Sequence, residues 1–249
     1  MALHPDDVVQ VADGVHRVRG GLVNWYLLED GADLTLVDAG YPGDADDVAR
    51  SVALTGHRTE DLRAVVVTHA HTDHLGAVPR LQAAHGIPVH ADPVEVAHVR
   101  RERLEQVTVP RVLAEAWRPR VAAWAVRALG RGGTREVRVA SVVPFPPGGP
   151  LDLPGAPVPV PTHGHTSGHT ALHLPAAGVV LTGDALVTGH PTSARPGPQL
   201  LPRMFHHDPA GAAAALEALA RLDADVVLPG HGEPFRGAVR DAVARALDR

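Results

Sequence analysis

Short apolar runs separated by glycine-containing turns open the chain and predict a β-meander. The candidate strands are residues 15–20 (VHRVRG), 24–30 (NWYLLED) and 33–40 (DLTLVDAG). Residues 44–56 then carry apolar side chains at helical spacing, and residues 64–69 (AVVVTH) form a continuous β-branched run. Such a run is typical of a strand covered on both faces, so the pattern indicates an α/β fold.

A helix and a strand follow, and the pattern then becomes helical. We expect a helix from about Leu75 to Ala84, with Pro79 tolerated near its first turn, and a strand at 87–92. Residues 93–129 are rich in Ala, Arg, Glu, Leu and Val, and Pro110 divides them into two predicted helices of similar length. We interpret this segment as an inserted helical lid or, alternatively, as a peripheral helix pair.

Strands return after a glycine-rich turn, and a helix closes the chain. The predicted strands are 135–141, 157–165, 170–175, 178–184 and 225–232, the last running into a loop, and the predicted helices are 210–222 and 237–248. Residues 188–209 form an irregular segment with five Pro, and a loop of that length is usually functional or mobile. No interdomain linker is recognisable, so we expect one domain over residues 1–249.

The composition argues against several classes of protein. Hydrophobic residues make up 45% and charged residues 20%, as in an ordinary globular chain. The net charge of −5 argues against nucleic acid or an anionic membrane as the main partner. The N-terminus does not resemble a signal peptide, and no stretch approaches the length of a transmembrane helix. We therefore expect a cytoplasmic protein that acts on a small molecule, with its oligomeric state left open.

The presence of 17 His and the absence of Cys point to metal ligands other than thiolates. The segment THAHTDHLG (68–76) places His69, His71, Asp73 and His74 directly after the buried strand. Residues two apart in an extended chain point the same way, so His69 and His71 can bind one ion. The chain then turns, and Asp73 and His74 can face a neighbouring point. Imidazole and carboxylate are ligands that zinc prefers, although a polar, solvent-facing loop is the alternative.

Three later segments each place a polar residue in a tight turn at the end of a predicted strand. They are THGHTSGHT (162–170) with His165, LTGDAL (181–186) with Asp184, and LPGHGEP (228–234) with His231. In α/β sheets, such strand ends converge at one edge and form sites from residues distant in sequence. Together with the first segment they make a candidate metal site.

This series of motifs resembles the metallo-β-lactamase fold superfamily, from LVDAG (36–40) to PGHGEP (229–234). The resemblance implies a four-layer αββα sandwich with the site at one edge of the two sheets. It also implies the following division of ligands: His69, His71 and His165 on one ion, Asp73, His74 and His231 on the other, and Asp184 bridging both. Asp38 matches a supporting acidic position of the family, or else caps a turn, and His169 is expected beside the ligands.

The implied chemistry is metal-dependent hydrolysis with two Zn²⁺ ions, or with iron or manganese in their place. Two ions about 3.5–4 Å apart can share a water and give hydroxide near neutral pH, which attacks an ester, thioester or lactone carbonyl. Asp73 is the expected catalytic residue that orients this nucleophile. The full ligand set most resembles the glyoxalase II-like thioesterases. The helical domain and basic residues that bind glutathione there are not recognisable, so the resemblance carries the reaction type and not the substrate.

The irregular segment supplies the candidate substrate contacts, which are Arg195, Arg203, Met204 and Phe205. The neighbouring His206 and His207 are expected in solvent. Two alternatives to the hydrolase remain. One is an oxidoreductase similar to the non-haem iron persulfide dioxygenases, which share this fold, and the other is a non-catalytic member that binds a metal or ligand.

Overall fold

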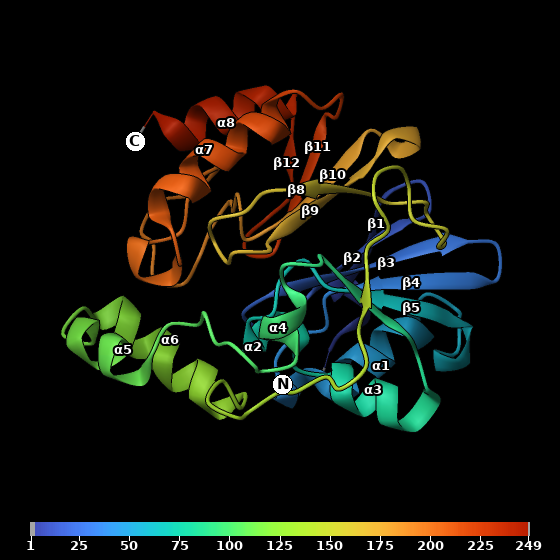
Figure 1. The fold of residues 1–249 in the computed structure, drawn as a ribbon, viewed down its shortest axis with the longest axis horizontal. Coiled ribbons are helices and arrows are strands. Elements are labelled where there is room, and N and C mark those ends of the chain that lie inside the picture. The colour runs from blue at the N-terminus through green and yellow to red at the C-terminus, as the bar shows by residue number, and fades with distance from the viewer. Residues whose placement is uncertain (1–2, 249) are drawn as a thin grey trace.

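Two sheets lie face to face in the computed structural model, which describes residues 3–248 (Figure 1). The first sheet follows the order of the chain: β1 (Val8–Ala12), β2 (Val15–Arg19), β3 (Asn24–Asp30), β4 (Asp33–Val37), β5 (Leu62–Val66), β6 (Val89–Ala91) and β7 (Val143–Pro144). Pairing is antiparallel from β1 to β4 and parallel from β4 to β7. The predicted meander and the predicted parallel region therefore belong to one sheet.

The second sheet is built from the later part of the chain, in the spatial order β12-β11-β10-β9-β8. Its strands are β8 (Val158–Pro161), β9 (Thr170–Leu174), β10 (Val179–Gly183), β11 (Val226–Pro229) and β12 (Phe235–Arg236). Only β10 and β11 pair in parallel. Their carboxyl ends consequently lie side by side, and these are the ends that carry Asp184 and His231.

Helices cover the outer face of each sheet (Figure 1). The helices are α1 (Ala45–Leu54), α2 (Thr72–Leu75), α3 (Val78–His85), α4 (Val96–Val99), α5 (Val109–Glu115), α6 (Pro119–Gly130), α7 (Pro209–Ala220) and α8 (Val239–Leu247). α1 and α3 lie against the first sheet, and α7 and α8 lie against the second. Pro79 falls in the first turn of α3, where a missing N–H removes no helical hydrogen bond.

Three apolar layers hold these elements together. The first joins β3 and β4 to α1, through side chains such as Leu27 and Val52. The second fills the space between the sheets, where Leu28 and Leu181 are fully buried. The third joins β10 and β11 to α7 and α8 and includes the fully buried Leu216 of α7. The order helix, sheet, sheet, helix confirms the four-layer αββα sandwich.

The prediction of a strand at 135–141 was wrong. Val137 and Val139 are buried while their neighbours are exposed, as in a strand, but the backbone N–H of Val139 donates to the Val99 oxygen and not to a sheet. The short strand β7 follows at Val143–Pro144 instead. Alternating burial reports the packing of side chains, and it does not require pairing with another strand.

The division of residues 93–129 into two similar helices was also wrong. The segment contains α4, a stretch without helix, and then α5 and α6, which form a hairpin. Pro110 does not separate two helices, because it lies in the first turn of α5, where Pro is favoured. Among residues 3–248, no helix combines the length and the apolarity needed to cross a membrane.

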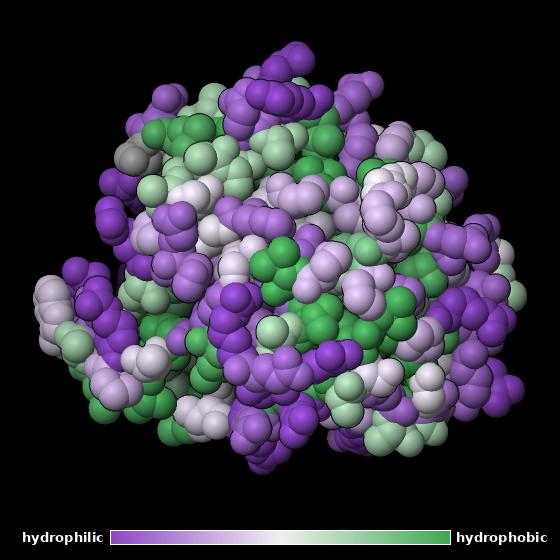
Figure 2. All heavy atoms as spheres, in the orientation of Figure 1, coloured by the Kyte–Doolittle hydropathy of each residue, from purple (hydrophilic) through white to green (hydrophobic). Residues whose placement is uncertain are grey.

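The α5–α6 hairpin extends from the side of the molecule and carries apolar side chains on its surface. Figure 2 shows apolar and polar residues intermixed where this hairpin lies, at the lower left. Large exposed apolar residues of the hairpin are Val109, Leu113, Trp117, Val126 and Leu129. Trp124, on the inner side of α6, is buried.

Candidate metal centre

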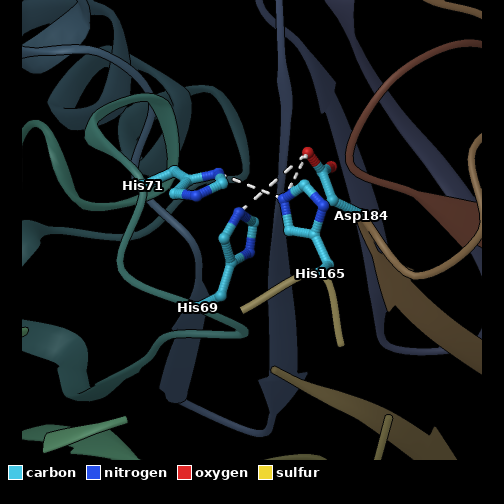
Figure 3. Close-up of side chains that lie close together, drawn as sticks. All are labelled: His69, His71, His165 and Asp184. Atoms are coloured by element: carbon cyan, nitrogen blue, oxygen red, sulfur yellow. Dashed lines mark hydrogen bonds and ion pairs between the residues drawn. The ribbon is translucent and has the colours of Figure 1, made fainter. Parts of the chain in front are cut away.

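Four buried side chains from separate strand ends point toward one another (Figure 3). His69 and His71 follow β5, His165 follows β8, and Asp184 follows β10. One potential ligand atom of each lies within 4.8 Å of those of the others. His71 Nδ1 is 3.1 Å from His165 Nε2, which is 3.5 Å from Asp184 Oδ2. This arrangement can surround a single ion.

Asp73, His74 and His231 form a second group of the same kind. His231 Nε2 lies 3.5 Å from Asp73 Oδ2 and 3.3 Å from Asp184 Oδ2. His74 Nε2 lies 3.4 Å from Asp184 Oδ1. Asp184 therefore contacts both groups, which is the position that a bridging ligand requires.

Glycines allow the strand ends to approach this closely. Gly183, directly before Asp184, has φ +48°, in the left-handed region that disfavours other residues. A Cβ on Gly230 would lie 2.4 Å from Asp184 Oδ1. The turn that carries His231 can contact Asp184 only because position 230 has no side chain.

One ring nitrogen of each of four histidines is engaged outside the cluster. The pairs are His69 Nδ1 with Thr68 Oγ1, His71 Nε2 with the Glu105 oxygen, His74 Nδ1 with Asp38 Oδ2, and His231 Nδ1 with the Leu22 oxygen, at 2.8–3.0 Å. A carbonyl oxygen only accepts, so His71 Nε2 and His231 Nδ1 donate their protons there. When such a ring is neutral, its opposite nitrogen has a lone pair that a metal ion can bind.

Unpartnered polar atoms show that the cluster fits a cation. Among the described residues, His69 Nε2, His74 Nε2 and Asp184 Oδ1 are buried and make no hydrogen bond of ordinary geometry, although the last two face each other as an ion pair at 3.4 Å. Leaving such an atom unsatisfied costs about 1–3 kcal/mol. A divalent ion among nitrogen and carboxylate ligands would satisfy all three, and this donor set suits zinc, iron or manganese.

The electrostatics favour the ligand forms of several residues. Burial, together with the nearby His98, lowers the pKa of His71 to about 4, and burial also lowers the pKa of His69 and His165 well below the usual value. These rings are neutral near pH 7, as ligands must be. Burial opposes the charge of Asp73, but the hydrogen bond from His231 lowers its pKa to about 2.

His74 and His231 behave in the opposite way. Burial lowers the pKa of His231, yet the Asp184 and Asp73 carboxylates outweigh it and raise the value to about 10. Burial likewise opposes the charge of His74, whose pKa Asp184 and Asp38 raise. Without metal, these two rings hold protons where a cation would lie, so the binding of a cation there would release protons.

The two residues expected behind the ligands lie in contact with them. Asp38 accepts from His74 Nδ1 at 2.8 Å and from the Thr68 N–H at 2.8 Å, so it connects β4 to the strand end that carries the candidate ligands. His169 Nε2 accepts the backbone N–H of Asp184 at 3.0 Å, and burial lowers the pKa of this ring to about 3. Asp38 thus orients a histidine and does not merely cap a turn.

The expected substrate contacts are divided between surface and core. Arg195 and Arg203 are exposed, Met204 is half-buried, and Phe205 is buried against Trp124 at a ring separation of 5.2 Å. Their contact with a substrate remains a prediction, and Phe205 packs in a buried apolar cluster with Trp124. His207 is exposed as expected.

The expectation for His206 was wrong. Its ring is half-buried, and its Nδ1 lies 3.2 Å from His165 Nδ1. The loop turns inward at this point because the backbone N–H of His207 donates to the His165 oxygen. No local pattern in the sequence indicates this long-range contact.

Further residues that no sequence pattern indicated adjoin the cluster. His190 is buried with its ring 4.8 Å from that of His231 and 5.2 Å from that of Phe205. Burial, followed by the Asp73 carboxylate, raises the pKa of Tyr41 well above its usual value. Glu95, in the segment interpreted as a lid, is fully buried behind the first group. A charged residue within a helical pattern normally faces water, so the sequence gives no signal for Glu95.

Comparison with known proteins agrees with this architecture. The family model described as the metallo-beta-lactamase superfamily matches residues 18–231. The chain is 26% identical to a probable metallo-hydrolase, YflN of Bacillus subtilis (strain 168), over 92% of this chain and 87% of that protein. It is 29% identical to a hydroxyacylglutathione hydrolase of Fuscovulum blasticum over 88% of this chain, and it spans 66% of that relative's length.

A solved structure has a similar fold. A metallo-beta-lactamase family protein from Thermus thermophilus superposes with a TM-score of 0.65 at 25% identity, over 94% of this chain and 78% of that chain. The matched region contains both groups of histidines and aspartates. The chain therefore belongs to the metallo-beta-lactamase superfamily and is related to metallo-hydrolases.

Proposed function

We propose that this protein is a hydrolase that holds two divalent metal ions and cleaves an ester, thioester or lactone. The observation that carries the proposal is the cluster around Asp184, in which three buried polar atoms lack a hydrogen-bond partner among the described residues. His69, His71 and His165 would hold one ion, and Asp73, His74 and His231 the other, with Asp184 shared. Zinc is the metal proposed first, and iron and manganese suit the same donors.

When bound, such ions lower the pKa of water toward neutrality and stabilise negative charge on a carbonyl oxygen. Asp73 is the residue proposed to act on the reacting water. Its side chain is 17% exposed, against 0–3% for Asp184 and the histidines in its ion pairs, so it lies nearest to solvent. Its ionised oxygen can accept a hydrogen bond from the attacking water and orient it toward the carbonyl.

The surroundings of His231 support a substrate with an apolar portion. Trp124, Phe205 and the neutral ring of His190 lie together, with ring separations of 5.2–5.8 Å. Burial lowers the pKa of His190 to about 3, so this wall carries no charge near pH 7. The relation to hydroxyacylglutathione hydrolases supports thioester cleavage as the reaction type, and we do not extend it to glutathione, because the chain spans 66% of such a relative.

The metal content of the purified protein, followed by a substrate panel, tests this proposal. We expect about two ions per chain and metal-dependent turnover of a thioester or lactone with an apolar acyl group. Phosphodiester substrates test for nuclease-like activity. Oxygen uptake with a persulfide substrate, in protein that contains iron, tests for dioxygenase activity. Turnover in either of those tests, with none of the carbonyl substrates cleaved, would contradict the hydrolase.

The Asp73→Ala variant separates its role in orienting water from its role in holding metal. We expect turnover to fall by about 10²-fold or more, the usual contribution of a group that transfers or orients a proton. Metal content and turnover are measured on the same sample. Full turnover with both ions bound would refute the assignment of Asp73.

A further inference from the structure

Glu95 is a fully buried carboxylate that belongs to neither group of proposed ligands. It immediately precedes α4, in the segment interpreted from sequence as a lid. Burial opposes its charge, but hydrogen bonds from His98 and from the backbone of Ala70 lower its pKa to about 2. An ionised group so deeply buried needs several donors, and the identity of those donors is informative.

Three of the four donors come from the two loops that carry His69, His71 and His165. Oε1 accepts the backbone N–H of Ala70, the residue between His69 and His71, at 2.8 Å. Oε2 accepts Thr166 Oγ1 at 2.9 Å and the backbone N–H of Gly168 at 3.0 Å, in the turn that contains His165. One carboxylate therefore connects the two loops whose histidines must meet.

The same contact depends on Gly168. A Cβ at this position would lie 2.3 Å from the backbone nitrogen of Glu95. The turn can lie directly against the start of α4 only because residue 168 has no side chain. The close approach brings the Gly168 N–H within reach of the carboxylate.

The peptide between His69 and His71 is held from its other side as well. Arg101 NH1 donates to the Ala70 oxygen at 2.7 Å, while Glu95 accepts the Ala70 N–H. Arg101 has φ +60°, a left-handed conformation that costs a non-glycine residue about 1–2 kcal/mol. Both polar groups of Ala70 are thus bonded to the segment around α4.

A chain of hydrogen bonds extends from Glu95 to the ring of His71. The Glu105 N–H donates to His98 Nε2 at 3.3 Å, so that nitrogen is the acceptor and Nδ1 is the nitrogen that donates to Glu95 Oε1 at 2.9 Å. His71 Nε2 in turn donates to the Glu105 oxygen at 2.9 Å. The chain fixes which nitrogen of His71 is protonated and leaves Nδ1 facing His165.

Glu95, His98 and Glu105 are close enough to resemble a third metal site, but their polar atoms are already engaged. The Glu105 carboxylate accepts from the N–H and Oγ of Ser167 and pairs with Arg103 Nε at 2.9 Å. None of the atoms of these three side chains is among the buried atoms without a partner in residues 3–248. These three side chains therefore hold neighbouring residues in place, and they have no free atoms with which to bind an ion.

We propose that Glu95 is a positioning residue for one ion site, because it holds the His71 and His165 loops at the spacing that a shared ion requires. The inference rests on the proposed pair of ions. It predicts an asymmetry, since none of the hydrogen bonds of Glu95 within residues 3–248 reaches Asp73 or His231. Loss of the carboxylate should weaken one ion and spare the other.

The test is a metal titration of the full chain with the Glu95→Gln variant. Gln cannot accept all four donors, because its amide nitrogen replaces one oxygen. Zn²⁺ binding is measured by competition with a chelator, and the visible spectrum of Co²⁺ reports the geometry of each site. We expect one ion to bind about 10–100-fold more weakly with an altered Co²⁺ spectrum, and the other to keep its affinity.

Ser51→Ala is the matched control for general destabilisation. It removes the buried hydrogen bond from Trp25 Nε1 to Ser51 Oγ, 3.0 Å long, between β3 and α1. We expect a lower Tm with both ions bound as in the wild type. Equal affinities in Glu95→Gln and the wild type would overturn the inference, and so would an equal loss at both sites.

Thr166→Val keeps the proposal testable if Glu95→Gln does not fold. It removes a single donor to Oε2 and preserves the volume of a fully buried side chain. We expect the affinity for the ion at the same site alone to fall several-fold, and unchanged metal affinity would overturn the inference. A wild type that binds two ions without hydrolysing any carbonyl substrate would refute the proposed function and leave this inference standing, whereas a wild type that binds none would refute both.

Discussion

Replacing Asp184 with Asn in the metal-free protein tests whether this carboxylate holds the cluster together. Burial lowers the pKa of His231, yet the charge of Asp184, the largest opposing cause, raises it from 6.5 to about 10. A pKa raised by about 3.5 corresponds to about 5 kcal/mol of stability when His231 is protonated. Asp184 supplies much of this stability. We therefore expect Asp184→Asn to lower the free energy of unfolding by about 3 kcal/mol near pH 6, as when one partner of a buried ion pair is removed.

The sign of the pH dependence follows from the direction of this pKa. A histidine with a raised pKa stabilises the folded state fully below the unfolded value of 6.5, and this stability is lost as pH rises toward 10. The difference between Asp184→Asn and the wild type should therefore be largest near pH 6 and shrink as pH approaches 10. Urea unfolding of both chelator-treated proteins at several pH values measures this difference in stability.

Asp44→Asn is the control for the loss of a buried carboxylate. Asp44 is 2% exposed and pairs with Arg131 and not with a histidine. We expect Asp44→Asn to be destabilising by a similar amount at every pH tested. A pH-independent cost for Asp184→Asn as well would refute the electrostatic reasoning for the metal-free cluster.

Three further outcomes are expected. Chelation should abolish hydrolysis and lower Tm, and zinc should restore both, because ligands that bind only the folded state stabilise it; activity that survives complete metal removal would contradict this. Asp38→Asn should weaken metal binding by about 10–100-fold in chelator competition, since Asp38 orients His74, and unchanged affinity would assign it a purely structural role. Gly230→Ala should cost about 1–3 kcal/mol and reduce metal content, because the new Cβ would meet Asp184 at 2.4 Å; a Tm and metal content equal to those of the wild type would show that the turn can move.

Much of the fold could be predicted because its strands are short, apolar and separated by glycines. The buried run at β5 and the helix α1 follow directly from their patterns. Residues 135–141 show the limit of this reasoning, because alternating burial arises there without strand pairing. That the chain forms one domain with 93–129 as an insertion stays a prediction, which limited proteolysis can test.

The candidate ligands could be found from sequence because four of them lie within six residues, His69 to His74. Their metal-binding role stays a prediction, while the structure brings their side chains together with those of the later motifs. The residues that surround them could not be found in this way. Glu95 contacts Gly168 across 73 residues, and His190 meets Trp124 only after the loop folds back. Such contacts depend on tertiary packing, which no local pattern records.

The three tryptophans provide optical probes at three depths of the protein. Trp25 is fully enclosed, Trp124 is 9% exposed beside His190, and Trp117 is 75% exposed at the turn of the α5–α6 hairpin. A soluble quencher such as acrylamide would therefore extinguish the emission of Trp117 first. The emission that survives comes mainly from the enclosed indoles, one of which is Trp124 in the proposed substrate-facing cluster, so substrate entry could be followed by fluorescence without any attached dye.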